Sequence, residues 1–449
     1  MLISFKNVNV GPMADRELKF APHLNVFTGD NSLGKSFLLD MLWFGLTRQW
    51  PHDLNPKVDG GFPARPREIR DPAKLTFDFK TMTGRHPDPL EFSFRRGWGV
   101  WKTGKGRKAQ PGLVVYAMSD GSFAVWDPIR NYWSNPSEEG QQARPPAYVL
   151  ARSELWPSAP RERSEYCKGV IEGWASWQND KDERLFKLLK EMVCALIPEK
   201  DGIEIGEVEK VPDDEGGNQP TLRFPYGTIR LQYASSAVRR MASLAYVLVW
   251  AISQHLDAAR NRGMDTTHNV ILLFDEIEAH LHPRWQRSII KGVLDALPKL
   301  CDLAGLVKNE LQMFVSTHSP LVMSALEDEF YCEDGQSCGQ RNKWFDFDLN
   351  GETRQVEIEE PDFNPRGTAE SWLTSRAFDL DSTYSPEVEK LLDEARRLAY
   401  SPEGEINCAI DCNCRLKEIV DELRDRMPLG NAWVRRLAAR LEETEHAEN

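Results

Sequence analysis

The sequence predicts an α/β fold, on the basis of three observations. A glycine-rich loop from Gly29 to Ser36 lies between the apolar run Leu24 to Phe27 and an apolar helical pattern. The continuous apolar run Val270 to Phe274 is typical of a strand buried in a parallel sheet. Between residues 75 and 133 the pattern predicts antiparallel strands, with Asp120-Gly121 as a hairpin signal. We therefore expect strands of both kinds in one chain.

Proline- and glycine-rich stretches separate the predicted elements. Residues 51–72 and 134–161 have the composition of irregular connections, and an acidic turn is expected at Asp213 to Gly217. From about residue 331 the pattern mixes short strands with helices. The other expected strands are Leu2 to Val10, Glu17 to Phe20, Leu75 to Phe79, Leu90 to Phe94, Leu113 to Ala117, Ser122 to Trp126 and Met313 to Ser316, and the expected helices run from Lys35 to about Trp50, Glu165 to Trp177, Asp182 to Ile197, Ala237 to Leu256, Pro386 to Tyr400, Leu416 to Arg426 and Ala432 to Glu443.

Composition narrows the class of protein. The chain has 449 residues, 41% hydrophobic and 28% charged, which suffices for a large core. No apolar stretch approaches the roughly 20 residues of a membrane span, and no signal-peptide pattern is present. We therefore expect a cytoplasmic protein, no membrane partner, and eight cysteines that are thiols. The net charge of −13 argues against a broadly basic nucleic-acid surface, although a local basic groove is compatible with it.

The segment Gly29-Asp30-Asn31-Ser32-Leu33-Gly34-Lys35-Ser36 has the spacing of a phosphate-binding loop. Its two glycines let the backbone curl, so that successive N–H groups point at the β- and γ-phosphates. Lys35 neutralises these phosphates, and the Ser36 hydroxyl reaches Mg²⁺. The strand before the loop and the helix opened by Phe37 supply the expected context. The sequence thus predicts nucleotide binding.

Two later strands end in residues suited to hydrolysis. The strand from Val270 is followed by Asp275, which can join the magnesium shell, and by Glu276, which can lie beside an attacking water. The next apolar strand ends at His318, whose imidazole can bond a γ-phosphate and report its loss. Each signal is weak alone, because buried strands often end in polar residues. Together with the upstream loop they predict a hydrolytic site.

The segment Tyr233 to Arg240 opens the long helix expected from Ala237. Serine hydroxyls and backbone N–H groups at a helix start form an anion site. Simple helix capping is the alternative, and one segment can serve both purposes.

Along the chain, the four elements are the phosphate loop at 29–36, the helix start at 233–240, the strand ending in Asp275 and Glu276, and the strand ending at His318. In this order they resemble the ATP-binding-cassette (ABC) ATPases. The closer resemblance is to the soluble SMC, RecF and OLD-like (overcoming-lysogenization-defect) branch, whose members are often called AAA family proteins. Asp275-Glu-Ile-Glu-Ala-His-Leu-His-Pro-Arg-Trp-Gln286 and Ser316-Thr-His-Ser-Pro320 are characteristic of the OLD-like group. Ile3-Ser-Phe-Lys-Asn7 followed by Gly11-Pro12 also resembles its first strand. The resemblance covers residues 1–50 and 220–330 well and the rest loosely.

The resemblance implies ATP and Mg²⁺ as cofactors. Lys35 and Ser36 would hold phosphate and Mg²⁺, and Asp275 would support Mg²⁺. Glu276 would act as the general base and His318 as the switch histidine. The catalytic group would therefore be Lys35, Glu276 and His318.

The resemblance also implies a homodimer or higher oligomer, because in this family two heads sandwich two ATP molecules. Ser235 and Ser236 would contact the γ-phosphate of the opposite subunit, and Arg239 would also bind nucleotide. Within one chain, the nucleotide contacts would be Gly29, Asp30, Asn31, Ser32, Leu33, Gly34, Lys35, Ser36 and Phe37.

In domain terms, the resemblance implies an ABC-type P-loop ATPase head with a mixed central sheet, an antiparallel β subdomain and a helical lobe. Residues 1–150 would form the first ATPase lobe with a β-rich insertion, and 151–220 a helical insertion. Residues 221–330 would form the second lobe, and 331–449 a C-terminal α+β and helical region.

Departures from the family pattern concern hydrolysis more than binding. The family usually has glycine where Ser32 and Ala237 stand, and glycine permits close approach and positive φ. The glutamine that usually contacts Mg²⁺ has no clear counterpart in the sequence. The candidates between the two halves of the site are Gln49, Gln110, Gln141 and Gln142.

Other segments leave alternatives open. A basic and aromatic run from Phe94 to Lys108 suits nucleic-acid contact or a solvated hairpin tip. Asp346, Asp348, Asp379 and Asp381 do not form a convincing TOPRIM nuclease. Cys332, Cys338, Cys408, Cys412 and Cys414 match no standard zinc spacing, and His280 and His282 suit a subunit contact better than a metal.

The leading hypothesis is an ATPase whose ATP-driven head dimerisation senses invasion and controls a separately encoded effector, a nuclease or toxin. By analogy with Septu or PARIS-type ATPases, this would be a bacterial anti-phage defence module. One alternative is a RecF-like repair or recombination ATPase that binds DNA through the basic run. Another is a nucleotide-gated scaffold with little turnover.

Overall fold

The computed structural model describes most of the chain, in two compact units, Met1–Trp372 and Leu373–Asn449. Each unit is considered by itself. The described residues are 1–80, 89–103, 110–131, 145–157, 162–212, 217–267, 269–306, 310–331, 341–380, 382–400, 409–427, 431 and 433–439.

The first unit is built on an eight-stranded mixed sheet with the strand order β18-β17-β3-β16-β15-β7-β8-β9. The central strands β17, β3, β16, β15 and β7 are parallel, and β18, β8 and β9 are antiparallel to their neighbours. The predicted α/β class and mixed central sheet are therefore confirmed. The strands are β3 (Leu24–Gly29), β7 (Leu113–Ala117), β8 (Phe123–Trp126), β9 (Tyr148–Leu150), β15 (Asn269–Asp275), β16 (Glu310–Ser316), β17 (Asn342–Leu349) and β18 (Val356–Glu359).

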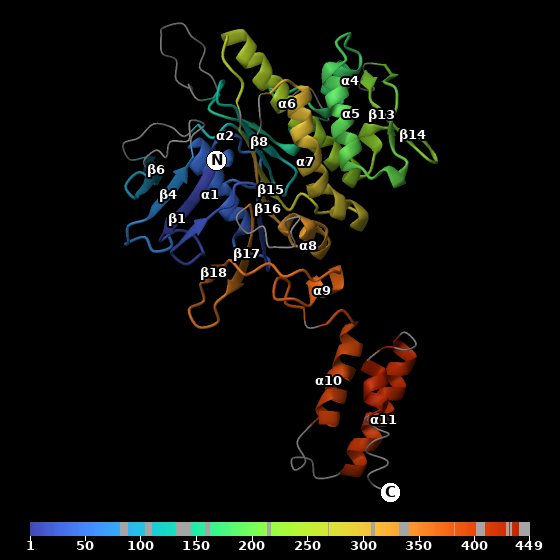
Figure 1. The fold of residues 1–449 in the computed structure, drawn as a ribbon. Helices are drawn as coiled ribbons and strands as arrows, with labels where there is room; N and C mark the ends of the chain where they lie inside the picture. The colour runs from blue at the N-terminus through green and yellow to red at the C-terminus, as the bar shows by residue number, and fades with distance from the viewer. Residues whose placement is uncertain are drawn as a thin grey trace. The chain divides into compact units, whose positions relative to one another are not determined.

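The strand register brings the functional strand ends to one edge of this sheet. Asp275 pairs with Ser316, and Ser316 pairs with Phe27, so β15, β16 and β3 end level with one another. Every residue of β15 is buried, as the continuous apolar run predicted. Helix α1 (Lys35–Thr47) contacts β15 and β16 (Figure 1). Its buried side chains share a core cluster with Ile271 and Leu273.

A second, antiparallel sheet with the order β2-β1-β4-β5-β6 forms the expected β subdomain. It packs on α1 at close range, because a Cβ on Gly45 would lie 2.4 Å from Cε1 of Phe77. Its strands are β1 (Leu2–Val8), β2 (Arg16–Lys19), β4 (Lys74–Phe79), β5 (Leu90–Arg95) and β6 (Val100–Thr103), and the short helix α2 (Pro51–Leu54) follows α1.

A helical lobe surrounds the long helix α6 (Ser236–Arg262). Helix α5 contacts both α6 and α7, and α6 contacts β7, which links this lobe to the central sheet (Figure 1). Further helices of the first unit are α3 (Arg152–Leu155), α4 (Val170–Gln178), α5 (Arg184–Leu196), α7 (Pro283–Leu303) and α8 (Pro320–Leu326), and α9 (Ala369–Leu373) ends one residue past the boundary at Trp372. The first unit also contains 3-10 turns at Glu199–Asp201, Leu231–Tyr233 and Glu327–Phe330, and the short strands β10 (Glu204–Ile205), β11 (Glu209–Lys210), β12 (Asn218–Gln219), β13 (Thr221–Phe224) and β14 (Gly227–Arg230).

The second unit contains α10 (Pro386–Tyr400) and α11 (Ala409–Arg426). These helices contact one another and have a core of their own that includes Leu392, Ile419 and Leu423. Its surface carries ion pairs such as Arg415 with Glu394, at 2.8 Å.

Several elements differ from the sequence prediction. Helix α7 was not predicted, and the 134–161 stretch contains β9 and α3 rather than only irregular chain. The units divide at 372/373 rather than at 330/331, because β17 and β18 belong to the central sheet. The first four residues of the acidic turn at 213–217 lie outside the described residues, as do parts of the helix expected at 432–443. Within the described ranges, no helix has the length and apolar character needed to cross a membrane.

Candidate functional site

The predicted phosphate loop connects β3 directly to α1 and depends on its glycines. Gly29 has φ 118° and Gly34 has φ 91°, both in the region that favours glycine. A Cβ on Gly29 would lie 2.2 Å from the carbonyl oxygen of Phe347. Ser32 also has positive φ, 67°, a backbone conformation that favours glycine. The loop therefore keeps its curl with one strained residue.

Lys35 is buried at the start of α1. Its Nζ donates hydrogen bonds to the carbonyl oxygens of Gly29 and Asp30, both at 2.8 Å. Burial lowers the pKa of Lys35 to about 8, against the opposing effect of the nearby carboxylates Glu276 and Asp275. The ammonium group thus lies under the loop, where it can turn to a bound phosphate.

Asp275 accepts hydrogen bonds from serine side chains of three segments. Ser36 Oγ and Ser316 Oγ donate to its Oδ1 at 3.0 and 2.6 Å, and Ser119, just after β7, also hydrogen-bonds to it. Burial raises the pKa of Asp275, and these hydrogen bonds act against that rise. Among the described candidates, Gln49 and Gln110 do not hydrogen-bond to Asp275. Gln141 and Gln142 lie outside the described residues.

This oxygen cluster fits Mg²⁺. In the described part of the chain, no group of three or more His, Cys, Asp or Glu side chains is placed to hold a metal. Mg²⁺ does not need one, because it is usually bound by one or two carboxylates together with phosphate oxygens and waters. Asp275 and the Ser36 hydroxyl supply such oxygens within hydrogen-bond distance of each other.

A neutral acid lies below this cluster. Asp40, one turn after Ser36 in α1, accepts a hydrogen bond from the Tyr116 hydroxyl at 2.9 Å. Burial raises the pKa of Asp40 to about 8. Asp40 is therefore mostly protonated at neutral pH and adds little negative charge next to Asp275.

Glu276 and His318 form the side of the site that faces solvent. His318 Nε2 lies 3.1 Å from Glu276 Oε1, and both side chains are about one-third exposed, at 27% and 31%. The hydrogen bond from His318 is the main reason why the pKa of Glu276 is lowered. Glu276 has φ 46°, and its N–H donates to the Ser316 carbonyl oxygen at 3.2 Å. A carboxylate that stays ionised at neutral pH and is in reach of water can accept a proton.

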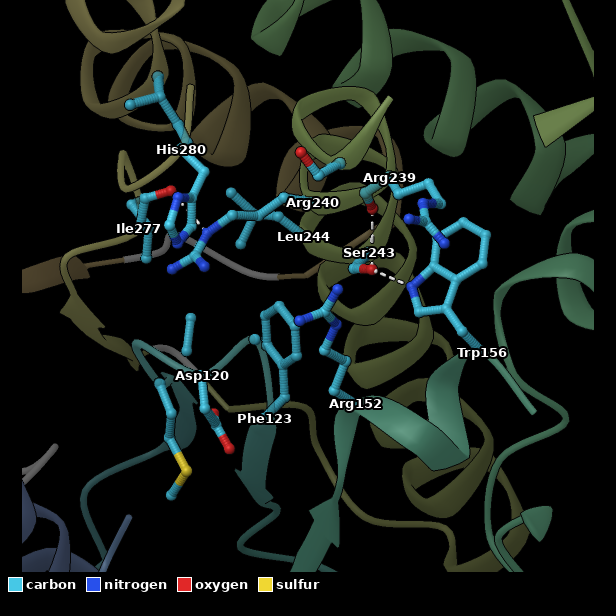
Figure 2. Close-up of a pocket in the computed structure, with 15 residues that line it drawn as sticks. Asp120, Phe123, Arg152, Trp156, Arg239, Arg240, Ser243, Leu244, Ile277 and His280 are labelled. Atoms are coloured by element: carbon cyan, nitrogen blue, oxygen red, sulfur yellow. Dashed lines mark hydrogen bonds between the residues drawn. The ribbon is translucent and has the colours of Figure 1, made fainter. Parts of the chain in front are cut away.

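Ser235 caps the start of α6, and Arg239 and Trp156 lie close to this helix start. Ser235 caps the helix by accepting from the Val238 N–H at 3.3 Å, and Ser236 is exposed. Arg239 lies over the Trp156 ring at 5.8 Å from its centroid, and its buried Nε has no hydrogen-bond partner among the described residues. Arg239 and Trp156 line a cavity of about 90 Å³ together with Arg240 and His280 (Figure 2).

Arg240 connects α6 to the hydrolytic loop. Its guanidinium donates to the carbonyl oxygens of Glu276, Ile277 and Ser119 at 3.0, 2.9 and 3.0 Å. Sequence reasoning gave Arg240 no role, although it ends the Tyr233 to Arg240 segment, and it missed Ser119, which stands in no recognisable motif. Only the pairing of distant segments reveals them.

A loop between β1 and β2 packs against the phosphate loop. A Cβ on Gly11 would lie 2.2 Å from Phe37, and one on Gly34 would lie 3.1 Å from Pro12. Arg67 holds this loop by donating to the carbonyl oxygens of Gly11 and Met13, at 3.2 and 2.7 Å.

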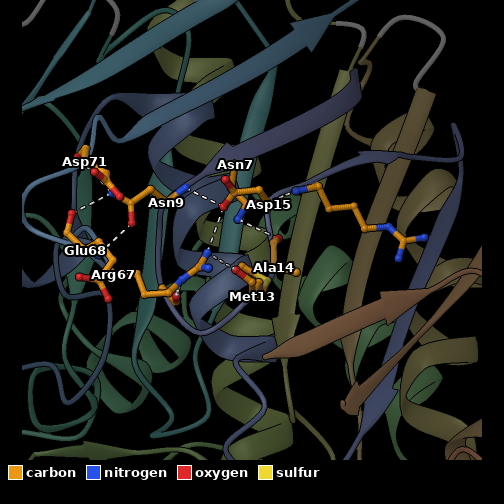
Figure 3. A network of polar contacts seen from close by, with 10 residues as sticks. Asn7, Asn9, Met13, Ala14, Asp15, Arg67, Glu68 and Asp71 are labelled. Atoms are coloured by element: carbon orange, nitrogen blue, oxygen red, sulfur yellow. Dashed lines mark hydrogen bonds and ion pairs between the residues drawn. The ribbon is translucent and has the colours of Figure 1, made fainter. Parts of the chain in front are cut away.

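Asn9 and Asp15 complete this network (Figure 3). Arg67 also donates to Asp15 Oδ1 at 3.0 Å, and the Asn9 N–H donates to the same oxygen at 2.7 Å. The Asn9 side chain bonds the backbone of Glu68 and Asp71. The 65–71 segment therefore fixes the loop that borders the phosphate site.

Behind the phosphate loop, Thr28 joins β3 to β17. Its hydroxyl donates to Asp346 Oδ1 at 2.7 Å and accepts from Trp344 Nε1 at 2.7 Å. All three side chains are buried. Asp346, considered above for a nuclease, serves here as a hydrogen-bond acceptor next to the phosphate loop.

The remaining candidates lie apart from this site or outside the described residues. Trp98 is 85% exposed at the β5–β6 turn, and Arg95 and Arg96 are also exposed. His282 caps α7 by accepting from the Arg284 N–H at 3.3 Å. Lys105, Lys108, Asp381, Cys332, Cys338 and Cys408 lie outside the described residues, as do the side chains of Cys412 and Cys414.

Known proteins similar to this chain include two bacterial proteins. Septu protein PtuA of Bacillus mycoides (strain KBAB4) is 29% identical over 169 residues, 37% of this chain and 19% of PtuA. The Retron Vc95 probable ATPase of Vibrio cholerae serotype O1 biovar El Tor is 37% identical over 59 residues, 13% of this chain and 9% of that protein. The chain thus matches less than one fifth of the length of these relatives.

Solved structures similar to this chain include an SMC head bound to the C-winged helix domain of ScpA, at 14% identity and a TM-score of 0.41, covering 80% of this chain and 97% of that one. The recombination mediator RecF in its ATPrS form is 12% identical with a TM-score of 0.35, covering 80% of this chain and 98% of the RecF chain.

Residues 24–324 match the family described as "AAA domain, putative AbiEii toxin, Type IV TA system". Because this match spans well over half of the chain, from the strand before the phosphate loop past His318, the chain belongs to this AAA-domain family.

Proposed function

We propose that this protein is a Mg²⁺-dependent ATPase that hydrolyses ATP to ADP and phosphate. The observation that carries the proposal is the meeting of Lys35, Ser36, Asp275, Glu276 and His318 at one edge of the central sheet. Phosphate binding, metal binding and a base are thereby combined in one place. Membership of the AAA-domain family supports the same activity.

The residues act in a simple order. The loop N–H groups and Lys35 bind the β- and γ-phosphates, and Ser36 with Asp275 would hold Mg²⁺, which offsets phosphate charge when bound. Glu276 accepts a proton from water as the water oxygen bonds to the γ-phosphorus. The bond from that phosphorus to the bridging oxygen breaks, and ADP leaves with this oxygen. His318, hydrogen-bonded to Glu276, orients the carboxylate and responds to the loss of the γ-phosphate.

We also propose that a second copy of the chain completes the site. Ser235 and Ser236 stand at the start of α6, where N–H groups and the helix dipole favour an anion. Ser236 is exposed, so it is available to the γ-phosphate of an opposite head. Arg239 would join this contact only after leaving the Trp156 ring.

The experiment measures the rate of phosphate release and, by light scattering, the mass of the oligomer. Purified protein with Mg²⁺ and ATP should release phosphate, and Glu276→Gln should retain ATP and move to the dimer mass in light scattering. Ser236→Arg should lower the dimer fraction without changing ATP affinity in the monomer. Absence of ATP binding by the wild-type protein would contradict the proposal. Dimerisation with phosphate release no faster than that of Glu276→Gln would instead favour the scaffold with little turnover.

We further propose that the ATPase cycle controls a separately encoded effector in anti-phage defence. The support is the similarity to Septu protein PtuA and to the Retron Vc95 probable ATPase, which agrees with the resemblance to Septu-type defence ATPases in the sequence motifs. Co-expression with the neighbouring gene, followed by copurification with and without ATP, tests this step. Loss of phage protection in Glu276→Gln is the expected result, and full protection would contradict the proposal.

A second candidate function is direct nucleic-acid binding. The exposed Trp98, with Arg95 and Arg96 beside it, offers a ring for stacking and charges for phosphate. Salt-dependent duplex or single-strand binding that is lost on changing both arginines to Gln would support it. No binding at low salt would exclude it.

A further inference from the structure

The hydrolytic residues Glu276 and His318 lie in two segments, 275–286 and 316–320. Two hydrogen-bonded side-chain pairs that include neither Glu276 nor His318 also join these segments. The first pair links Glu278 and Thr317, which are both buried. Thr317 Oγ1 donates to Glu278 Oε1, and it accepts from the Ser319 N–H at 3.0 Å. The second carboxyl oxygen of Glu278 has no hydrogen-bond partner within the described ranges, and burial raises its pKa to about 7. This carboxyl therefore has Thr317 as its side-chain partner.

The second pair links Gln286, in α7, to Ser319. Ser319 Oγ donates to Gln286 Oε1 at 2.7 Å, and Gln286 Nε2 donates to the Leu281 carbonyl oxygen at 3.0 Å. Ser319 also caps α8 by accepting from the Val322 N–H at 3.4 Å. Gln286 thus ties together the loop after β15, helix α7 and the start of α8.

His318 lies between these two anchored residues. Thr317 is fully buried and Ser319 nearly so, whereas the His318 ring is partly exposed and contacts Glu276. His318 is therefore held at its ring by Glu276 and along its backbone by the residues on either side. Its backbone position comes from its two neighbours, and they are held by Glu278 and Gln286.

We propose that Glu278 and Gln286 are positioning residues for hydrolysis, which hold Thr317 and Ser319 so that His318 meets Glu276. This inference rests on the proposed ATPase function. It assigns these residues no contact with nucleotide, so they affect the rate of the chemical step and not ATP affinity. Displacements of about 1 Å in an active site can cost about 100-fold in rate. Losses of supporting hydrogen bonds around metal sites typically cost about 10–100-fold.

The test uses Thr317, where two variants separate the hydroxyl from the shape. Thr317→Val keeps the volume and removes the donor, and Thr317→Ser keeps the donor. We expect Thr317→Val to lower kcat about 10–100-fold with the ATP Kd within twofold of wild type. Thr317→Ser should restore kcat to within about threefold. A matched control is Thr221→Val, because Thr221 is also buried and bonds the Glu207 carbonyl oxygen, in β13 away from the site.

Two Glu278 variants test whether the oxygen that accepts from Thr317 matters and not the charge of the carboxylate. Glu278→Gln keeps an oxygen for Thr317 and should retain kcat within about threefold, whereas Glu278→Leu should lose as much as Thr317→Val. The double variant Glu278→Leu with Thr317→Val should lose no more than either single variant, because both remove one interaction. Additive losses would overturn the proposal, and so would an unchanged kcat in Thr317→Val.

A second readout does not need hydrolysis. The ring ¹⁵N signals of His318 report its hydrogen bond to Glu276, and they should move in Thr317→Val and in Gln286→Leu but not in Thr221→Val. If the wild-type protein fails to hydrolyse ATP, the proposed function fails while these signals still test the positioning. If hydrolysis is normal and the signals stay unchanged in both variants, the positioning inference alone is wrong.

Discussion

The binding side of the site, from Gly29 to Ser36 with the loop that borders it, is shaped by backbone groups. The hydrolysis side, around Glu276 and His318, is shaped by pairs of side chains from separate segments. Lys35 reaches carbonyl oxygens only five and six residues away, whereas Thr317 and Glu278 are 39 residues apart. The phosphate contacts of the binding side thus lie within one short motif, and the 9–15 loop and Arg67 support that motif from outside. Hydrolysis requires several motifs to be brought together by the sheet.

The largest expected effect is on the hydrolysis side. Glu276→Gln removes the proton acceptor and should lower kcat by about 10²–10⁴-fold, the usual contribution of acid–base catalysis. ATP affinity should stay within about threefold, measured by equilibrium binding with Mg²⁺. Glu165→Gln, at an exposed position, is the control. Equal losses of kcat and affinity would show that the two sides are not separable.

The pH dependence of ATP binding tests the binding side. Lys35 has a pKa of about 8 in the free protein, and bound phosphate favours its charged form. Below pH 8 this lysine is already charged, so its contribution to affinity is constant. Above pH 8 it loses its proton, and each binding event must restore it, so Kd should rise about tenfold per pH unit.

The matched control for this titration is Lys35→Arg, which stays charged throughout. Its affinity should be flat between pH 7 and 9.5, whatever its absolute value. The same rise in Kd in this variant would assign the pH dependence to another group.

A smaller effect is expected from the network that holds the bordering loop. Arg67→Gln removes donors to Gly11, Met13 and Asp15 and should loosen this loop against the phosphate loop. We expect the ATP Kd to rise about tenfold, a cost of about 1.4 kcal/mol, with kcat at saturating ATP unchanged. A fall in kcat with normal Kd would place Arg67 on the hydrolysis side instead.

The smallest effect concerns Ser32. Its φ of 67° costs a non-glycine residue about 1–2 kcal/mol, and glycine loses about 0.5–1 kcal/mol through backbone entropy. Ser32→Gly should therefore raise the free energy of unfolding by less than about 1.5 kcal/mol, measured by denaturant titration. A loss of stability would show that the Ser32 side chain contributes more than its strain costs.

The two sides also differ in how far the sequence predicts them. The phosphate loop, β15 and β16 follow from local patterns, and the structure has them in the expected order. Helix α7 escaped prediction, since it contains Pro298, a residue that ordinarily breaks helices. The Ser119 hydroxyl and the Arg240 guanidinium act through partners more than 30 residues away, so no local pattern reveals them. The parallel pairing of β17 with β3 is long-range in the same sense.

The hydrogen bond between Trp344 and Thr28 allows nucleotide binding at the phosphate loop to be followed by tryptophan fluorescence. The indole N–H of Trp344 donates to the residue that precedes Gly29, and Trp344 is 6% exposed. Indole emission responds to such a hydrogen bond and to nearby charge. ATP entering the loop should therefore change the emission of this one tryptophan. The difference between wild type and Trp344→Phe isolates its signal from the other thirteen, which gives a label-free way to follow nucleotide arrival in real time.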